Sequence, residues 1–148
     1  MVEITPTTYP HIRAVAEDMR MFDQRELKLF LGKDPLAALS FIQENSNACF
    51  TVFHKGVPSV IVGYNITDLL FNVASPFMIA TNYAEAHPLL FARHSPELMK
   101  QFKGFYLRNW VLAKNEFAIK WLEWLGFFVH PTSEFNDQMI RMFTKDCR

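Results

Sequence analysis

The histidines are the side chains of this chain best suited to acid–base or metal chemistry, and they stand at positions 11, 54, 87, 94 and 130. No two of them are four residues apart, and neither cysteine lies near one at the spacing of a zinc site. Glu85-Ala86-His87 could supply a general base beside a predicted strand that ends at Tyr83, with an exposed loop as the alternative. The sequence therefore predicts no metal centre and leaves one candidate acid–base segment.

Arg93, His94 and Ser95 form the candidate anion-binding group. Ser95-Pro96-Glu97 combines a hydroxyl, a proline and an acid, which predicts a helix that begins there. Arg93, His94 and the Ser95 hydroxyl could hold an anion at this helix start, and a helix cap with solvent-facing charges is the alternative. The predicted helix carries one apolar stripe, formed by Leu98, Met99, Phe102, Phe105 and Tyr106. The chain has neither a Gly-x-Ser-x-Gly elbow nor a Gly-Lys-Ser/Thr phosphate loop.

Composition narrows the class of protein further. The 148 residues are 50% hydrophobic, which is ample for a packed core and too apolar for a disordered chain. Fifteen Lys and Arg balance 15 Asp and Glu, so no overall basic field indicates a nucleic-acid partner. Two cysteines, Cys49 and Cys147, cannot build a disulfide framework, and the first ten residues lack a signal-peptide pattern. These features favour the cytosol, or the inside of a particle assembled there.

The segment from Gly56 to Ala84 contains one charged residue, Asp68, and is the only candidate for a membrane span. Two prolines and several polar residues interrupt it, whereas a spanning helix needs about 20 predominantly apolar residues. We therefore expect two buried strands joined by a loop, and no transmembrane segment.

The elements that must position these side chains follow from periodicity and turn signals. The predicted strands cover residues 2–5, 48–54, 57–66, 77–83, 109–113, 127–130 and 139–144, with a polar loop at 132–138. The predicted helices cover residues 10–20, 24–31 and 34–45, a helix that starts at Ser95, and a short helix that Asn115 caps and Gly126 ends. This order predicts a single α/β domain over residues 1–148. Its sheet is mixed but mostly antiparallel, with six to seven strands and helices on both faces.

One segment near the C-terminus resembles a known family. Trp110 to Asn115, then Ala118-Ile119 and Gly126-Phe127, resembles the strand–Asn–helix–Gly-Phe unit of the GNAT N-acetyltransferase superfamily. The order of elements also matches that superfamily over about residues 3–144. The resemblance implies the GNAT fold and transfer of an acetyl group from acetyl-CoA. The cofactor would be held by the strand backbone near Ile79–Thr81, by Asn115 and by the Arg93–Ser95 region.

Two features of working GNAT enzymes are missing. The stretch Phe91–Glu97 has no glycine, although the superfamily uses a glycine-rich loop there to bring backbone amides to the cofactor pyrophosphate. Leu122 stands seven residues after Asn115, where many members have a tyrosine that protonates the departing thiolate. Such general-acid assistance is typically worth 10²–10⁴-fold in rate. The resemblance therefore implies a fold whose usual catalytic equipment has been lost.

A closer resemblance is to the GNAT-like small internal virion protein family of short-tailed phages. The opening Ile4–Thr7 and the stretch from Trp121 to His130 carry it. It implies an internal virion or morphogenesis component, or a binder of a host protein, found in the virion interior or the host cytoplasm, with no cofactor expected. The alternative is a divergent acetyl-CoA-dependent N-acetyltransferase, and a third hypothesis is a membrane-active protein. The acceptor, the partner and the oligomeric state are not predicted.

Overall fold

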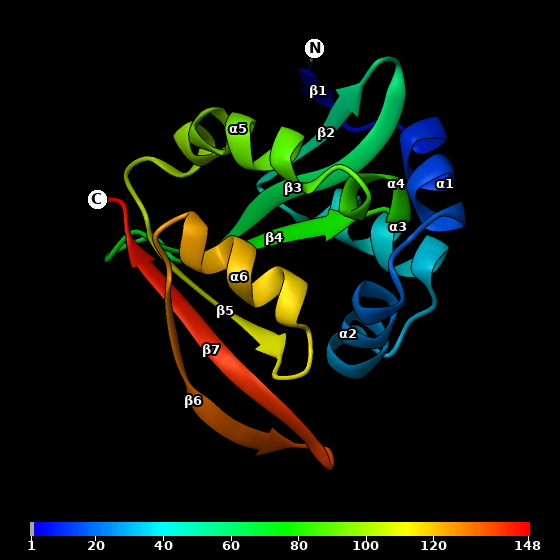
Figure 1. Cartoon of the computed structure of the whole chain (residues 1–148). Coiled ribbons are helices and arrows are strands. Elements are labelled where there is room, and N and C mark those ends of the chain that lie inside the picture. Colours follow the sequence, from blue (N-terminus) through cyan, green and yellow to red (C-terminus); the bar gives the residue numbers. More distant parts are fainter. Residues whose placement is uncertain (1) are drawn as a thin grey trace. The chain divides into compact units, whose positions relative to one another are not determined.

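Seven strands form one sheet in the computed structural model, which describes residues 2–148 (Figure 1). They are β1 (Val2–Pro6), β2 (Ala48–His54), β3 (Val57–Asp68), β4 (Val73–Ala80), β5 (Tyr106–Leu112), β6 (Phe128–Phe135) and β7 (Gln138–Asp146). The strand order is β1-β2-β3-β4-β5-β7-β6. The pairing of β4 with β5 is parallel, while β1–β2, β2–β3, β5–β7 and β6–β7 pair antiparallel. This confirms the predicted mixed, mostly antiparallel sheet.

Helices connect the strands. They are α1 (Tyr9–Glu17), α2 (Met21–Leu31), α3 (Pro35–Asn45), α4 (Asn82–Glu85), α5 (Pro88–Met99), the 3-10 turn η1 (Lys100–Phe102) and α6 (Glu116–Trp124). Contacts group the chain into two compact units. Unit 1 consists of the residues up to Asn65 with Phe77–Phe91, and unit 2 of Ile66–Pro76 with Ala92–Arg148. The strands β3 and β4 and the helix α5 run from one unit into the other.

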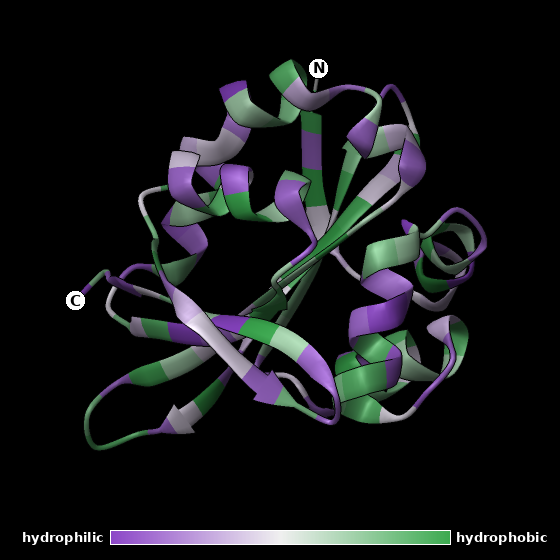
Figure 2. Cartoon of the chain, turned by 60° about the horizontal axis from the view of Figure 1, so that its bottom comes forward, coloured by the Kyte–Doolittle hydropathy of each residue, from purple (hydrophilic) through white to green (hydrophobic). Residues whose placement is uncertain are grey.

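The core of unit 1 joins its first three helices to β3 and β4. Its members are buried apolar side chains, namely Ile12, Val15, Met19, Leu27, Ala38, Leu39, Ile61 and Ile79. The helix residues recur at three- and four-residue intervals, which places them on one face. In Figure 2, hydrophobic and hydrophilic residues accordingly alternate along the helices. Each large side chain buried here contributes about 1.5–3 kcal/mol to folding.

A close approach within unit 1 requires glycine at position 63. A Cβ built on Gly63 would lie 2.0 Å from the Ala48 carbonyl oxygen and 2.6 Å from the Phe77 ring. Because the nearest atom belongs to the backbone of the paired strand β2, it cannot move aside as a flexible side chain would. Gly63 therefore allows β2 to pair closely with β3.

Unit 2 is built on the long antiparallel pair of β5 and β7, which runs from Tyr106 opposite Asp146 to Leu112 opposite Ile140. The helix α6 contacts β6 and buries Ile119 and Leu122. The unit's buried apolar side chains also include Phe102, Leu107, Val111, Leu125, Phe127 and Phe143. Unit 2 therefore has an apolar core of its own, and α6 is fixed in it.

β6 is an edge strand of the sheet. Its pairing with β7 shifts register between Val129 and Thr132, and Pro131 lies in that shift. Arg141 on β7 donates from Nε to the His130 carbonyl at 2.7 Å and from Nη2 to the Val129 carbonyl at 3.2 Å. The arginine therefore supplies donors to two carbonyls in this irregular part of the edge.

Local capping signals predicted several boundaries correctly. The strand β2 has the predicted bounds, Ala48–His54, and α3 begins at Pro35 directly after Asp34. Gly32 ends α2 with φ of 68°, in the left-handed conformation that glycine tolerates. These signals lie within a few residues of the boundary that they define.

The predicted helix start at Ser95 is wrong. The helix α5 begins at Pro88 and runs through Pro96 to Met99. The start is instead at His87-Pro88, where the His87 carbonyl accepts from the Phe91 amide at 3.4 Å and proline takes the first helical position. The predicted apolar stripe also ends early, because Gly104 has a φ of 97° and β5 begins at Tyr106.

Two other predicted boundaries are wrong. The strand predicted over residues 77–83 is β4, which begins at Val73 and ends at Ala80, because Thr81 caps α4 instead of extending the strand. The loop predicted over residues 132–138 is mostly strand, and the turn between β6 and β7 is Asn136-Asp137. Both turn residues have a positive φ, 48° and 62°, as tight hairpin turns require.

Candidate functional site

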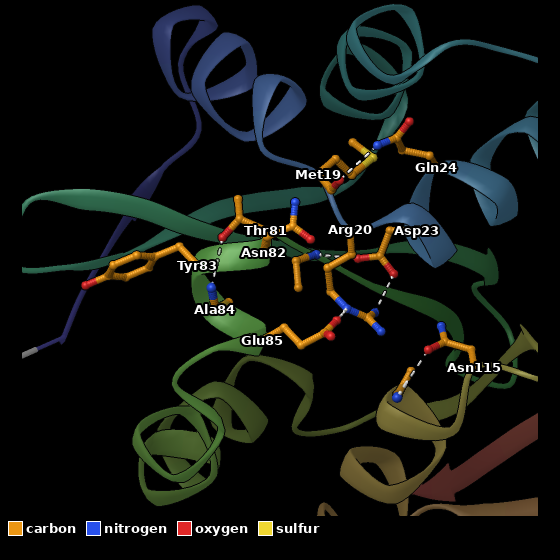
Figure 3. A network of polar contacts seen from close by, with 12 residues as sticks. Met19, Arg20, Asp23, Gln24, Thr81, Asn82, Tyr83, Ala84, Glu85 and Asn115 are labelled. Atoms are coloured by element: carbon orange, nitrogen blue, oxygen red, sulfur yellow. Dashed lines mark hydrogen bonds and ion pairs between the residues drawn. The ribbon is translucent and has the colours of Figure 1, made fainter.

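The segment that follows β4 is the first part of the candidate site (Figure 3). Thr81 donates from its amide and from its hydroxyl to the Ser59 carbonyl, at 3.0 and 2.9 Å. The same hydroxyl accepts from the Ala84 amide at 3.1 Å and so caps α4. Because Thr81 is only 1% exposed, all of these bonds lie inside unit 1.

Asp18 accepts the hydrogen bonds of the first two residues of α4. Its carbonyl accepts from the Asn82 amide at 2.8 Å, and its carboxylate oxygen Oδ2 accepts from the Tyr83 amide at 3.1 Å. The Asn82 side-chain amide donates to Asp18 as well, at 3.2 Å. The carbonyl and the carboxylate of Asp18 therefore occupy the backbone amides at the start of this short helix.

A buried ionic network lies at the end of β4 (Figure 3). Arg20 donates to Asp23 at 2.9 Å and also bonds Glu85, and both Arg20 and Asp23 are at least 96% buried. The other Asp23 oxygen accepts from the Ala80 amide at 2.6 Å, and the Arg20 amide donates to the Ala80 carbonyl at 3.1 Å. Burial raises the pKa of Asp23 to about 6, although the Arg20 guanidinium opposes this shift.

The candidate general-base segment Glu85–His87 is held by bonds within unit 1. Glu85 is paired with Arg20, and His87 Nδ1 lies 2.7 Å from the Tyr83 carbonyl oxygen. The Tyr83 hydroxyl lies 2.7 Å from Nδ1 of His54, and the Tyr83 and His87 rings are 4.5 Å apart. The segment consists of the last residue of α4 and the turn that follows it, and all three residues are exposed, as the alternative interpretation predicts.

Asn115 lies where the sequence predicts it, between β5 and α6 in unit 2. Its side-chain oxygen accepts from the Ala118 amide at 3.4 Å, and its backbone carbonyl accepts from the Ile119 amide at 3.0 Å. The residue is fully buried. Gly126 ends the unit with φ of 94°. Leu122, at the position of the missing tyrosine, is buried in the core and offers no proton.

The predicted anion group is divided between a buried and an exposed side chain. Ser95 is 2% exposed, and its hydroxyl accepts from the Trp121 indole N–H at 3.1 Å. Arg93, two residues earlier on α5, is exposed. Residues two apart on a helix do not share a face, so Arg93 and Ser95 do not form one pocket. The bond from Trp121 does link Ser95 to α6, the helix that Asn115 caps.

Sequence reasoning missed Asp18, Asp23 and His54. Their partners are 65, 57 and 29 residues away along the chain. Asp23 is in the first turn of α2, where an acid has an ordinary local interpretation. Asp18 is the residue that ends α1, and no local pattern indicates its distant partner. Among residues 2–148 no group of three or more metal-ligating side chains exists, and no helix is long and apolar enough to cross a membrane.

Comparisons with known proteins bear on the fold. No protein-family model matches the chain, and no curated protein does. Solved structures do match. An N-acetyltransferase from Staphylococcus aureus Mu50 aligns with a TM-score of 0.66 and 14% identity, over 100% of this chain and 99% of that one. An acetyltransferase of the GNAT family from Streptococcus pneumoniae gives 0.65 and 10%, over 98% of each chain.

A third match is spermidine N-acetyltransferase from Vibrio cholerae, solved in complex with CoA and spermine. It gives a TM-score of 0.67 and 14% identity, over 97% of this chain and 94% of that one. These matches show that the chain has the fold of GNAT N-acetyltransferases, as the sequence predicted. They lend no support to the resemblance to phage internal virion proteins, which stays a hypothesis.

The spermidine N-acetyltransferase was solved with CoA, and the segment after β4 of this chain does not fit the phosphates of that group. The amides from Ala80 to His87 are bonded within unit 1. The segment also has no glycine. A phosphate needs free amides and a backbone that it can approach closely, and this segment offers neither.

Proposed function

We propose that this chain transfers an acetyl group from a pantetheine thioester, such as acetyl-CoA, to an amine. The observation that carries the proposal is the β5–Asn115–α6–Gly126 unit. Its asparagine cap, helix and left-handed glycine stand at the spacing of the GNAT pattern, within a fold that acetyltransferases share. Local chemistry and overall architecture therefore point to the same reaction class.

Two predicted donor contacts stay proposals, each considered within its own unit. They are Ile79 near the end of β4 and Asn115 at the start of α6. Arg93 and Ser95 are the remaining predicted contacts, one exposed and one bonded to Trp121. Thr81 was predicted as well, but its amide, hydroxyl and carbonyl all have partners within unit 1. Since Leu122 cannot protonate the thiolate, we expect slow turnover compared with enzymes that have the tyrosine.

The test is release of free thiol from acetyl-CoA in the presence of a panel of amines, with mass spectrometry of the products. The panel should contain a polyamine, an aminoglycoside and peptides with free N-termini. Amine-dependent thiol release with a product heavier by one acetyl group supports the proposal. No release above the rate without protein, for every amine, overturns it for this panel.

A second candidate function is binding to a protein partner, in a virion or in the host, without acetyl transfer. The turn between β3 and β4 favours it, because Leu69, Leu70 and Phe71 are 79%, 82% and 62% exposed. Three consecutive apolar side chains in a turn suit a partner surface. Recovery of one partner with the wild-type chain, and not with a Leu70→Asp variant, would support this candidate if the thiol assay is negative.

A further inference from the structure

The backbone amides after β4 are occupied one after another. Those of Ala80, Thr81, Asn82 and Tyr83 donate to Asp23 Oδ2, the Ser59 carbonyl, the Asp18 carbonyl and Asp18 Oδ2. Those of Ala84, Glu85, Ala86 and His87 donate to Thr81 Oγ1, the Thr81 carbonyl, the Asn82 carbonyl and the Ala84 carbonyl. A phosphate could reach these amides only by displacing bonds that are already made, and each typically contributes about 1 kcal/mol.

Two of the acceptors are carboxylates, and their negative charge further disfavours the binding of an anion at this segment. Asp18 and Asp23 place negative charge directly on the Tyr83 and Ala80 amides. Glu85 adds a third carboxylate in the same segment. Unit 1 has eight acidic and six basic side chains, and one of the basic ones, Arg20, is bonded to Asp23 and Glu85. Like charges at short range repel, so the segment disfavours a pyrophosphate.

The residues that follow His87 offer a phosphate few further contacts. The helix α5 begins with Pro88, which has no N–H to donate. Leu89 and Leu90 follow, and their side chains limit how closely a phosphate can approach this backbone. Arg93, one turn later and exposed, is the remaining cation that the sequence predicts as a phosphate contact.

From these contacts we propose that the acyl donor is recognised by its pantetheine arm and thioester, and not by its phosphates. This inference rests on the proposed acetyl transfer and narrows its donor. The donor class is then an acylated pantetheine arm, either in free acetyl-CoA or attached to a carrier protein. Enzymes that hold the pyrophosphate on free amides lose much of their donor binding when the phosphates are removed, whereas this chain loses little.

The experiment compares three donors with one amine that the wild-type chain acetylates. They are acetyl-CoA, acetyl-pantetheine and a carrier protein with an acetylated phosphopantetheine arm. We expect kcat/KM for acetyl-pantetheine to be within about tenfold of that for acetyl-CoA, which corresponds to less than about 1.4 kcal/mol. A preference for acetyl-CoA of 100-fold or more, on the order of 2.8 kcal/mol, overturns the inference. The measurement with the carrier protein shows whether the thioester on the carrier or free acetyl-CoA is used faster.

Binding provides a readout that does not depend on turnover. In titration calorimetry, CoA and pantetheine should bind with similar affinity, and adenosine 3′,5′-bisphosphate should give no heat. Binding of the bisphosphate as tightly as CoA would overturn the inference while leaving the acetyl transfer intact. If neither CoA nor pantetheine binds and no donor is used, the proposed function itself fails, and the inference with it.

Arg93→Gln is the matched variant, because it removes an exposed cation without touching the core. We expect the ratio of its kcat/KM values for acetyl-CoA and acetyl-pantetheine to equal the wild-type ratio. A loss confined to acetyl-CoA would show that Arg93 binds the phosphates and would overturn the inference.

Discussion

The indole N–H of Trp124 donates to the carbonyl oxygen of Ala92 at 3.3 Å. Ala92 lies four residues before Pro96, which has no N–H, so the usual i+4 helical bond to the Ala92 carbonyl cannot form. The tryptophan on α6 supplies the missing donor from 32 residues away. One turn further on, Trp121 donates to Ser95, so both indoles of α6 bond α5.

This relationship predicts that the Trp124 bond and Pro96 are coupled. Trp124→Phe should lower the free energy of unfolding by about 1 kcal/mol, the usual net value of one hydrogen bond. Pro96→Ala restores the helical donor to Ala92, so the same substitution should cost less in that background. Urea unfolding of the wild type, both single variants and the double variant measures the coupling. Equal losses in the two backgrounds would contradict it.

Gly63→Ala should destabilise the chain strongly, by about 3 kcal/mol or more. The added methyl group would lie 2.0 Å from the Ala48 carbonyl, so β2 and β3 would have to separate. Gly32→Ala is the matched control, since its Cβ has no atom within 4 Å and only the positive φ is strained. We expect that control to cost about 1–2 kcal/mol. Thermal unfolding distinguishes the two, and a smaller loss for Gly63→Ala than for Gly32→Ala would contradict the close approach.

We predict that the stability of the chain depends on pH through the Asp23 carboxyl group. Its pKa is raised to about 6 in the folded chain, against about 3.9 when unfolded. The folded state therefore binds this proton more tightly than the unfolded state does. The resulting contribution of Asp23 to the free energy of unfolding is complete below about pH 4 and is lost as the pH rises through about 6. The loss is on the order of 3 kcal/mol.

Asp23→Asn removes that titration, so comparison with the wild type isolates it. The free energy of unfolding of the wild type, relative to that of Asp23→Asn, should fall between pH 4 and pH 7. Other titrating groups, such as His11, cancel in this difference. Urea unfolding at several pH values measures it, and a difference that does not change with pH would refute the assignment.

Asn115 and Leu122 should separate donor binding from folding. Asn115→Ala is expected to weaken binding of the pantetheine thioester and to cost about 1 kcal/mol of stability, because it also removes the α6 cap. Leu122→Ala leaves a cavity in the unit 2 core and should cost about 2–5 kcal/mol without changing the donor Kd. Calorimetric titration at a temperature where both variants are folded checks this. Equal Kd values for Asn115→Ala and the wild type would remove Asn115 from the site.

The sequence predicted those features whose cause lies within a few residues. Asp34-Pro35 marks the start of α3, and Asn115 and Gly126 bound α6, as the sequence predicts. Ser95-Pro96 shows where such reasoning fails. The same residues occur inside α5, where two tryptophans of α6 bond Ser95 and Ala92. A local pattern cannot show such a distant donor.

The closed segment after β4 could not be predicted for the same reason. Its absence of glycine is visible in the sequence, but the bonds that occupy its first four amides, from Ala80 to Tyr83, come from Asp18, Asp23 and Ser59. One of these, Asp23, is an acid in the first turn of a helix, where an acid has an ordinary local role. Contacts between residues 20 to 65 positions apart depend on the packing of α1 and α2 beside β4, which no short pattern contains.

The irregular edge strand β6 has a consequence for solubility. An exposed strand edge is a template on which another chain can add a strand, and this leads to aggregation. In β6, Pro131 withholds one amide, the register shift breaks the regular row of donors and acceptors, and Arg141 covers the carbonyls of Val129 and His130. The edge is therefore protected against strand addition, and replacement of Pro131 by valine should promote self-association of the folded chain.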